Sequence, residues 1–309
     1  MVQEGIKQLE SKQEIPMEKL IRPTLNIDGD IFCYRAASAT DGRYYEVTPL
    51  GRPPIRFKYK KEADKYMEDN PATYTVDLKY EPEPESHAIK ILENSLVSLE
   101  TLVSVHIQGI GEKRCYLSRG GSFREKLNPL YKNNRAGIHR PEHLNFLKDY
   151  MTKKYGAICE YGKYEADDLL AMNQGENTIC VSIDKDMLQF PGAHFNPVKN
   201  KYLIVTEEEG NRSLYRQLLT GDTADGIPGL KGVGPKTAEK LLSDTLEPYD
   251  MYCICLKEYL KKIPKETGED TTQHGIRVMG IIKTNMQMLY LLRSADDKWE
   301  MPTQGDDNA

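Results

Sequence analysis

The sequence predicts an α/β fold with a mostly parallel central sheet, because short apolar runs alternate with segments of helical period. Residues 24–27 (TLNI) and 178–183 (TICVSI) have the length and β-branched content of buried strands. Between them, residues 86–108 repeat apolar side chains at helical spacing. Strands that are separated by helices pair in parallel sheets with the helices on their faces. A chain of 309 residues allows one large or two medium domains.

The composition is that of an ordinary globular protein, with 39% hydrophobic and 29% charged residues. No run approaches the roughly 20 apolar residues of a membrane span, and the charged N-terminus lacks a secretory signal. The six cysteines have neither zinc-type nor disulfide-framework spacing, which favours free thiols. We therefore expect a cytoplasmic protein (the host cytoplasm if it is viral) with no membrane partner.

The net charge of −5 argues against a nucleic-acid partner, but the charges are unevenly distributed. Residues 119–154 carry nine Lys or Arg and three acidic residues, a net charge of +6. In this segment Tyr131, Lys132 and Arg135 would let a ring stack on a base while the cations meet phosphate oxygens. A solvated charged surface is the alternative interpretation.

Along the chain we expect a core with one insertion, followed by a helical region. Residues 114–117 and 201–206 predict further strands. Residues 41–85 interrupt the α/β pattern and predict a hairpin and a short helix near residues 60–69. The predicted parts are a charged lead-in (1–23), a core (24–206) that contains the insertion (41–85) and a basic loop (119–140), a helical region (207–293) and a frayed acidic tail (294–309).

Carboxylates gather on both sides of the strand predicted at residues 178–183. They open a helix before this strand, follow its C-terminal end, and also end the first strand. These residues are Glu165, Asp167 and Asp168, then Asp184 and Asp186, and finally Asp28. Carboxyl ends of parallel strands share one sheet edge, where ligands bind. Like charges at one site need a multivalent cation, and oxygen ligands without His or Cys favour Mg²⁺ or Mn²⁺ over zinc.

Each acidic group also has an ordinary explanation. Acids at a helix start stabilise the helix macrodipole, and Asp after a strand is common in turns. Asp30 is equally compatible with a helix cap and with a metal ligand. The combination of two groups around one strand favours the metal site.

A second signal follows at residues 221–242, which combine two aspartates with a glycine-rich hairpin. Asp222 and Asp225 add a carboxylate pair, and the hairpin leads into a helix that begins near Pro235. Backbone N–H groups at such a helix start form a phosphate seat, although a plain turn between helices is the alternative. The residues expected to contact DNA are Gly229, Gly232, Val233, Gly234, Lys236, Thr237 and Lys240.

Five motifs together resemble one family. NIDGD, YKNNR, YEADD, IDKD and GDTADGIPGLKGVGPKTAEKLL occur in the order found in the 5′ nuclease superfamily of flap endonucleases, polymerase 5′-nuclease domains and bacteriophage 5′-to-3′ exonucleases. The resemblance covers residues 24–242 without the insertion and is strongest to stand-alone phage-type members. It implies a PIN-like (resolvase-like) core and a helix–three-turn–helix region that binds duplex DNA, in some members around a K⁺ ion.

The resemblance also implies roles for the acidic and basic residues. Two divalent ions, Mg²⁺ or Mn²⁺, are implied. The first would be bound by Asp28, Glu165 and Asp167, and the second would be surrounded by Asp168, Asp184, Asp186, Asp222 and Asp225. Tyr131, Lys132 and Arg135 match the basic entry motif of the helical gateway or arch. The implied reaction is metal-assisted phosphodiester hydrolysis, with Lys132 and Arg135 steering the phosphate.

The expected partners are DNA with 5′ ends, flaps or nicks, and replication proteins, and we expect the chain to be a monomer. One departure from the family pattern matters. An aspartate usually ends the second strand, whereas Leu117-Ser118-Arg119 stands here. The departure keeps open the alternative of a catalytically silent DNA-binding scaffold. A PIN-type ribonuclease is a second alternative, although the duplex-binding hairpin argues against it.

Overall fold

The computed structural model describes residues 22–304 except residue 246, so most of the predicted lead-in and the last five residues lie outside the described part. The chain forms two compact units. Within the described residues, the first unit contains the chain up to Asp28, Leu99–Ile138, and everything from Ala157 onward. The second unit contains Gly29–Ser98 and His139–Gly156. The domain boundaries predicted at residues 23, 206 and 293 stay predictions.

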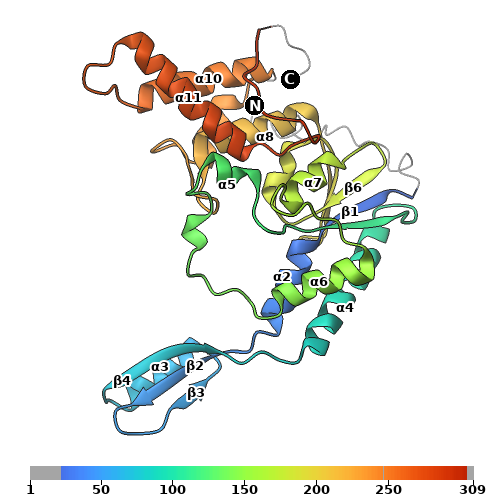
Figure 1. The fold of residues 1–309 in the computed structure, drawn as a ribbon, viewed down its shortest axis with the longest axis vertical. Coiled ribbons are helices and arrows are strands. Elements are labelled where there is room, and N and C mark those ends of the chain that lie inside the picture. The colour runs from blue at the N-terminus through green and yellow to red at the C-terminus, as the bar shows by residue number, and fades with distance from the viewer. Residues whose placement is uncertain (1–21, 246, 305–309) are drawn as a thin grey trace, which may run out of the picture. The chain divides into compact units, whose positions relative to one another are not determined.

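A five-stranded sheet lies at the centre of the first unit (Figure 1). Its strand order is β5-β1-β6-β7-β8, and the strands are β1 (Thr24–Asp28), β5 (Lys113–Tyr116), β6 (Thr178–Val181), β7 (Gly192–Asn196) and β8 (Lys201–Val205). The first four are parallel and β8 is antiparallel to β7. Ile27 pairs with Cys115 on one side and with Val181 on the other. The predicted mostly parallel sheet is confirmed, and β7 is a strand that the sequence analysis missed.

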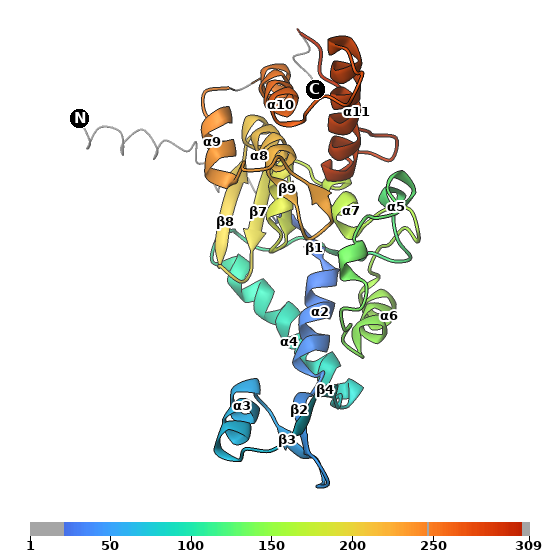
Figure 2. The same cartoon turned by 90° about the vertical axis from the view of Figure 1, so that its left-hand side faces the viewer.

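The first unit also contains helices, of which α7 packs on this sheet while α8–α11 form a second buried core. The helices are α5 (Phe123–Leu127), α7 (Ala166–Met172), α8 (Glu207–Thr220), α9 (Pro235–Leu242), α10 (Pro248–Lys262) and α11 (Thr271–Leu289), with the short turns η2 (Asn133–Arg135) and η3 (Lys185–Gln189). Helix α7 packs on β1 and β5, while α8 packs against α9, α10 and α11 (Figure 2). Apolar residues of α8–α11 form one buried cluster, which also includes Tyr131.

The end of the described chain is part of this core. Trp299 is only 6% exposed, and its ring lies 6.3 Å from the ring of Tyr252 in α10. The prediction of a frayed tail is therefore wrong at Trp299, because burying an indole ring outweighs the acidic composition around it.

The second unit combines helices with a small separate sheet. Helix α2 (Gly29–Ala39) packs against α6 (Leu144–Tyr155), and α4 (Glu85–Ser104) begins in this unit. The insertion forms an antiparallel sheet of order β3-β2-β4, from β2 (Arg43–Pro49), β3 (Ile55–Phe57) and β4 (Tyr74–Tyr80), with α3 (Lys60–Asp69) packed on it. The predicted hairpin and short helix are confirmed, and β4 adds a third strand. No helix in the described part of the chain has the length and apolar content to span a bilayer.

Candidate active site

Helix α7 carries the first acidic group at its start, and a buried arginine holds one member of the group. Glu165 is the N-cap residue of α7, and its backbone N–H donates to Asp168 Oδ2 at 3.2 Å. Arg124 is 2% exposed and donates from Nη1 and Nη2 to the two carboxylate oxygens of Asp168, at 2.7 and 2.8 Å. Asp168 is thus fully buried with both oxygens paired, and its predicted role as a metal ligand stays a prediction.

The same arginine ties α7 to the chain that follows α11. Arg124 Nε donates to the carbonyl oxygen of Met288 at 2.7 Å, and Nη2 donates to that of Tyr290 at 2.8 Å. The backbone N–H of Leu292 donates to Asp168 Oδ1 at 3.3 Å. Burial alone would lower the pKa of Arg124, but the hydrogen bonds and charge of Asp168 raise it, so the guanidinium is fully charged.

The three residues of the basic motif meet two of the acids. The Tyr131 hydroxyl lies 2.8 Å from Glu165 Oε2 and 2.9 Å from Asp225 Oδ2. Lys132 Nζ donates to Glu165 Oε1 at 2.5 Å and lies 3.7 Å from Asp225 Oδ2. Arg135 Nη2 donates to Asp225 Oδ1 at 2.6 Å. Burial would raise the pKa of Glu165, but Lys132 and other nearby cations outweigh it and lower the pKa.

Lys132 has a backbone φ of +55°, which is unusual for any residue other than glycine. Its backbone N–H donates to the carbonyl oxygen of Asp225 at 3.1 Å, and this contact fixes the conformation. Such outliers cost about 1–3 kcal/mol and cluster at functional sites. The strain is a signal of function that is independent of the acidic residues.

A second group of carboxylates lies where β1 and β6 end. Burial raises the pKa of Asp167 well above its ordinary value, and the charges of Asp28, Glu165 and Asp184 raise it further. Ser182 links two of these acids, because its hydroxyl donates to Asp28 Oδ2 at 3.0 Å and accepts from the backbone N–H of Asp184 at 3.1 Å. The structure therefore brings four predicted ligands from three segments into electrostatic contact.

Asp186 and Asp222 extend this cluster from the turn η3 and from the strand β9 (Gly221–Asp222). The backbone N–H of Asp186 donates to Asp184 Oδ1 at 2.9 Å. Lys185 Nζ donates to Asp186 Oδ1 at 2.8 Å and lies 3.7 Å from Asp222 Oδ2, to which Gln217 also donates at 3.0 Å. Burial and the charge of Asp184 raise the pKa of Asp186 to about 6. For Asp222, burial opposes ionisation, but Lys185 and hydrogen bonds lower the pKa.

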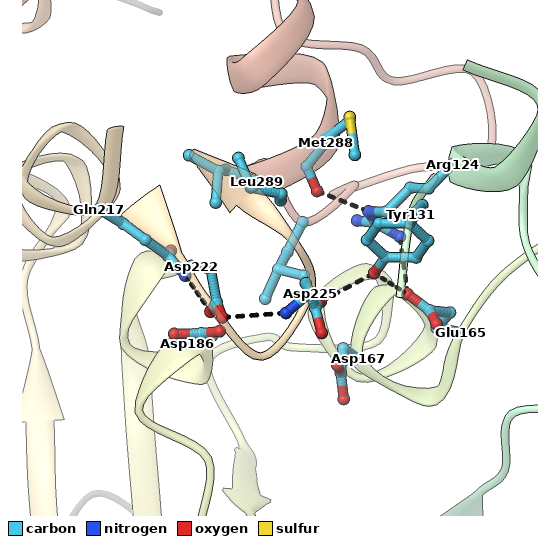
Figure 3. A pocket seen from close by; sticks show the side chains of 12 residues that line it. Arg124, Tyr131, Glu165, Asp167, Asp186, Gln217, Asp222, Asp225, Met288 and Leu289 are labelled. Atoms are coloured by element: carbon cyan, nitrogen blue, oxygen red, sulfur yellow. Dashed lines mark hydrogen bonds and ion pairs between the residues drawn. The ribbon is translucent and has the colours of Figure 1, made fainter. Parts of the chain in front are cut away.

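A pocket opens among these groups, and Figure 3 shows how they lie around it. Asp186 and Asp222 face each other on one side, and Tyr131 lies with Glu165 on the other (Figure 3). Asp167 and Asp225 also line the pocket.

Asp30 lies in the second unit, within the first turn of α2. Its carboxylate pairs with Lys148 at 2.7 Å. Its place in the first turn of α2 suits the helix macrodipole, and its possible metal role stays a prediction.

The donor chemistry of the cluster fits a hard divalent cation, since its members are carboxylates with no His or Cys among them. The charges of Asp28, Glu165 and Asp184 help to raise the pKa of Asp167, and those of Asp184 and Asp222 help to raise that of Asp186, so these carboxylates lie close enough to favour a shared cation. Among the described residues, however, no three His, Cys, Asp or Glu side chains are arranged so that they could hold a metal ion as they stand. Lys132, Arg135 and Lys185 pair with several of these carboxylates.

The predicted DNA-contacting segment forms a hairpin and a helix in the first unit. Strand β9 pairs with β10 (Ile227–Pro228), and α9 begins at Pro235 with Gly234 as its N-cap. Gly229 has no room for a side chain, because a Cβ there would lie 2.1 Å from the carbonyl carbon of Thr220. Six of the seven predicted residues are exposed, namely Gly229, Gly232, Gly234, Lys236, Thr237 and Lys240. Val233 is buried in the α8–α11 cluster.

Sequence reasoning missed four residues that shape the site, which are Arg124, Ser182, Lys185 and Gln217. Arg124 was counted only as part of a basic segment. No apolar pattern in its short helix marks Arg124 as buried, because Leu127, one turn further on, is exposed. The residue at the end of the second strand was noted for its missing acid, and Ser118 has a definite role there. Its hydroxyl accepts from the backbone N–H of Ala166 at 2.8 Å, at the start of α7.

The parallel sheet with carboxylates at its strand ends defines an α/β protein with an acidic candidate active site. No family model matches the chain. Among its sequence relatives, DNA polymerase I of Rhizobium leguminosarum is 33% identical over 143 residues, which are 40% of this chain and 14% of that protein. Flap endonuclease Xni of Shewanella baltica is 35% identical over 140 residues, which are 39% of this chain and 52% of that protein. The chain thus spans about half or less of the length of these curated relatives.

Among solved structures, the bacteriophage T5 D15 flap endonuclease in a complex with DNA and metal ions has a TM-score of 0.51. It is 13% identical, and the match covers 87% of this chain and 89% of that one. At this identity the likeness shows the fold. The sequence relatives and this fold confirm the predicted resemblance to the 5′ nuclease superfamily.

Proposed function

We propose that the chain is a divalent-metal-dependent 5′ nuclease that hydrolyses DNA phosphodiester bonds at or near 5′ ends, flaps or nicks. One observation carries the proposal, namely that acids from four separate segments converge beside Tyr131, Lys132 and Arg135 in the first unit. The names of the relatives, flap endonuclease Xni and DNA polymerase I, agree with this activity. So does the T5 flap endonuclease complex, which contains DNA and metal ions.

Asp28, Asp167, Asp184 and Asp186 are the residues that would hold divalent ions, Mg²⁺ or Mn²⁺. Their oxygen donors suit such ions, and the raised pKa values of Asp167 and Asp186 reflect burial and nearby negative charge, which a cation would offset. Bound divalent ions supply a water of lowered pKa and stabilise charge on the phosphoryl oxygens. Glu165 and Asp222 line the pocket together with Asp167 and Asp186.

The chain's own cations would position the substrate. Lys132 and Arg135 now pair with Glu165 and Asp225, and a phosphate that enters the pocket offers them the same kind of oxygen acceptor. The Tyr131 hydroxyl lies within hydrogen-bond distance of both acids and so holds the segment that carries the two cations against Glu165 and Asp225. The exposed hairpin with Lys236 and Lys240 would meet duplex backbone, so we expect selectivity for DNA shape and ends. A K⁺ ion at this hairpin is part of the same proposal.

The experiment that tests the proposal is cleavage of a 5′-labelled flap by the Asp184→Asn variant. Asp184 is exposed and accepts a hydrogen bond from the backbone N–H of Asp186 as the N-cap of η3. Asn caps equally well, so the variant should fold. We expect the wild-type chain to cleave the flap with Mg²⁺ or Mn²⁺ and the variant not to cleave it. The two proteins should bind the DNA equally well. Asp244→Asn, at an exposed acid outside the pocket, is the matched control and should cleave normally.

One observation favours a second candidate, a catalytically silent DNA-binding scaffold. Ser118 follows Leu117 after β5, at the place where the family pattern has an acid. Its hydroxyl accepts a hydrogen bond from the backbone N–H of Ala166, the first residue of α7. Wild-type protein that binds flap DNA but does not cut it with either metal would support this scaffold. A strict preference for RNA would instead indicate a PIN-type ribonuclease.

A further inference from the structure

The inserted subdomain of the second unit carries a group of cations that the candidate active site does not use. Residues 52–61 (RPPIRFKYKK) contain five Lys or Arg and no acid. They run through the turn after β2, along β3 at the edge of the small sheet, and into the first turn of α3. We define the cationic edge as Arg52, Lys58, Tyr59, Lys60 and Lys61, all of which are exposed.

The cations of this edge are not neutralised by neighbouring acids. Arg56, which lies in the same segment, shows what a neutralised cation looks like here. Its Nη1 donates to Glu81 at 2.8 Å, and its guanidinium lies 4.5 Å from the ring of Tyr44. By contrast, no ion pair within residues 22–304 involves the four cations of the cationic edge. Their charge is therefore available to an external polyanion.

Most of the charges at the two ends of α3 oppose its macrodipole. Lys60 and Lys61 stand in the first turn, where the helix end is positive, and Glu68 and Asp69 stand near the last turn, where it is negative; Glu62, which closes the capping box in the first turn, is the exception. Both placements destabilise the helix, and uncharged residues at these four positions would avoid the repulsion with the helix ends. An anion bound along the cationic edge would offset the positive charge of Lys60 and Lys61 at the helix start. Anion binding therefore explains these lysines, whereas helix stability does not.

The aromatic ring within the edge indicates the kind of anion. Tyr59 is 57% exposed, and Lys58 Nζ lies 5.7 Å from the centre of its ring. An exposed ring among cations suits a chain that carries both phosphates and free base faces, and base faces are free in single strands but hidden in a duplex. We propose that the cationic edge binds single-stranded DNA, a contact additional to the candidate active site. The choice of DNA as the polyanion rests on the proposed function.

Binding of the full chain to a labelled single-stranded oligonucleotide in EDTA tests this proposal, because no cleavage is then required. The edge variant is Arg52→Ser, Lys58→Ser, Lys60→Ser and Lys61→Ser combined. The matched control removes the same number and kind of exposed cations elsewhere, in Arg35→Ser, Lys90→Ser, Lys153→Ser and Lys199→Ser. We expect the edge variant to bind at least about 10-fold more weakly. The slope of log K against log salt should fall by up to about 2.8, at about 0.7 for each lost phosphate contact.

A second variant separates stacking from charge. Tyr59 is the N-cap residue of α3, and Ser is a better N-cap, so Tyr59→Ser removes the ring without weakening the helix. We expect about 10-fold weaker binding with an unchanged salt slope, as for loss of one stacked base. Equal weakening in edge variant and control, or no weakening in either, overturns the proposal. So does edge-dependent binding to phosphatidylglycerol vesicles without edge-dependent binding to the oligonucleotide.

The outcome is distinguishable from failure of the proposed function. A wild-type chain that cuts no DNA but loses oligonucleotide binding in the edge variant refutes the nuclease and retains the cationic edge. If the wild-type chain cleaves DNA and the edge variant binds the oligonucleotide as well as the wild type does, the nuclease is retained and the cationic edge is refuted.

Discussion

The pair formed by Arg124 and Asp168 can be tested by removing each partner alone and then both together. Both side chains are buried, and the guanidinium donates two hydrogen bonds to the carboxylate and two to backbone carbonyls. Removing one member of a buried pair leaves an unpaired charge and costs about 3–5 kcal/mol. We therefore expect Arg124→Met and Asp168→Asn each to lower the free energy of unfolding by about that amount.

The double variant Arg124→Met with Asp168→Asn shows whether these costs share one cause. If they do, the double variant should lose far less than the roughly 6–10 kcal/mol expected from addition, since no buried charge is left without a partner. Two backbone carbonyls, of Met288 and Tyr290, remain without their donor and set the residual cost at about 1–3 kcal/mol each.

Urea unfolding in EDTA measures these differences without a metal contribution. Trp299 is the only tryptophan in the sequence and is buried in the first unit, so its fluorescence reports on this part of the fold. The reasoning is refuted if Asp168→Asn costs under about 1 kcal/mol in EDTA, or if the single costs add in the double variant. A small cost in EDTA combined with a large loss of Mg²⁺ affinity would instead assign Asp168 to a metal.

Three further predictions concern packing and pH. Gly229→Ala should cost about 1–3 kcal/mol or more, because its Cβ would lie 2.1 Å from backbone atoms, whereas Gly280→Ala, with open space in α11, should stabilise by about 0.5–1 kcal/mol. Trp299→Ala should lower the free energy of unfolding by about 3–5 kcal/mol in calorimetry or urea titration, and a loss below 1 kcal/mol would contradict its burial. Burial lowers the pKa of His194 to about 4, below its ordinary value of about 6.5, so protonation favours the unfolded state. The contribution of His194 to the free energy of unfolding is fully present above pH 6.5 and should be lost as the pH falls to 4. Over this range the wild type should therefore lose about 3 kcal/mol more than His194→Gln.

The sequence could predict the class of fold because its strands are marked by local composition. Residues 24–27 and 178–183 are apolar and β-branched, and both lie in the parallel sheet as expected. Strand β7 (Gly192–Asn196) was missed because its short sequence GAHFN contains no β-branched residue and begins with glycine, and it is held by pairing with β6 and β8. Tertiary pairing of this kind leaves no local signal.

The candidate site was predictable to the extent that strand ends specify position. Asp28 and Asp184 end neighbouring strands, so their meeting follows from the parallel order of β1 and β6. The partner of Asp168 could not be predicted in this way, because Arg124 is 44 residues away and comes from the separate short helix α5. The sequence shows which residues carry charge, while only the fold decides which opposite charge each one meets.

The acidic cluster contains two carboxylates that are adjacent in sequence but have different neighbours in the fold. Asp167 and Asp168 are adjacent, yet Asp168 faces a permanent cation whereas the pKa of Asp167 is raised by burial and by other acids. An arginine that is fixed by backbone carbonyls cannot leave, so Asp168 is neutralised within the fold. The charge on Asp167 has no such fixed partner and favours an exchangeable cation. We therefore expect the two neighbouring carboxylates to take different roles, Asp168 anchoring α7 and Asp167 binding a metal ion.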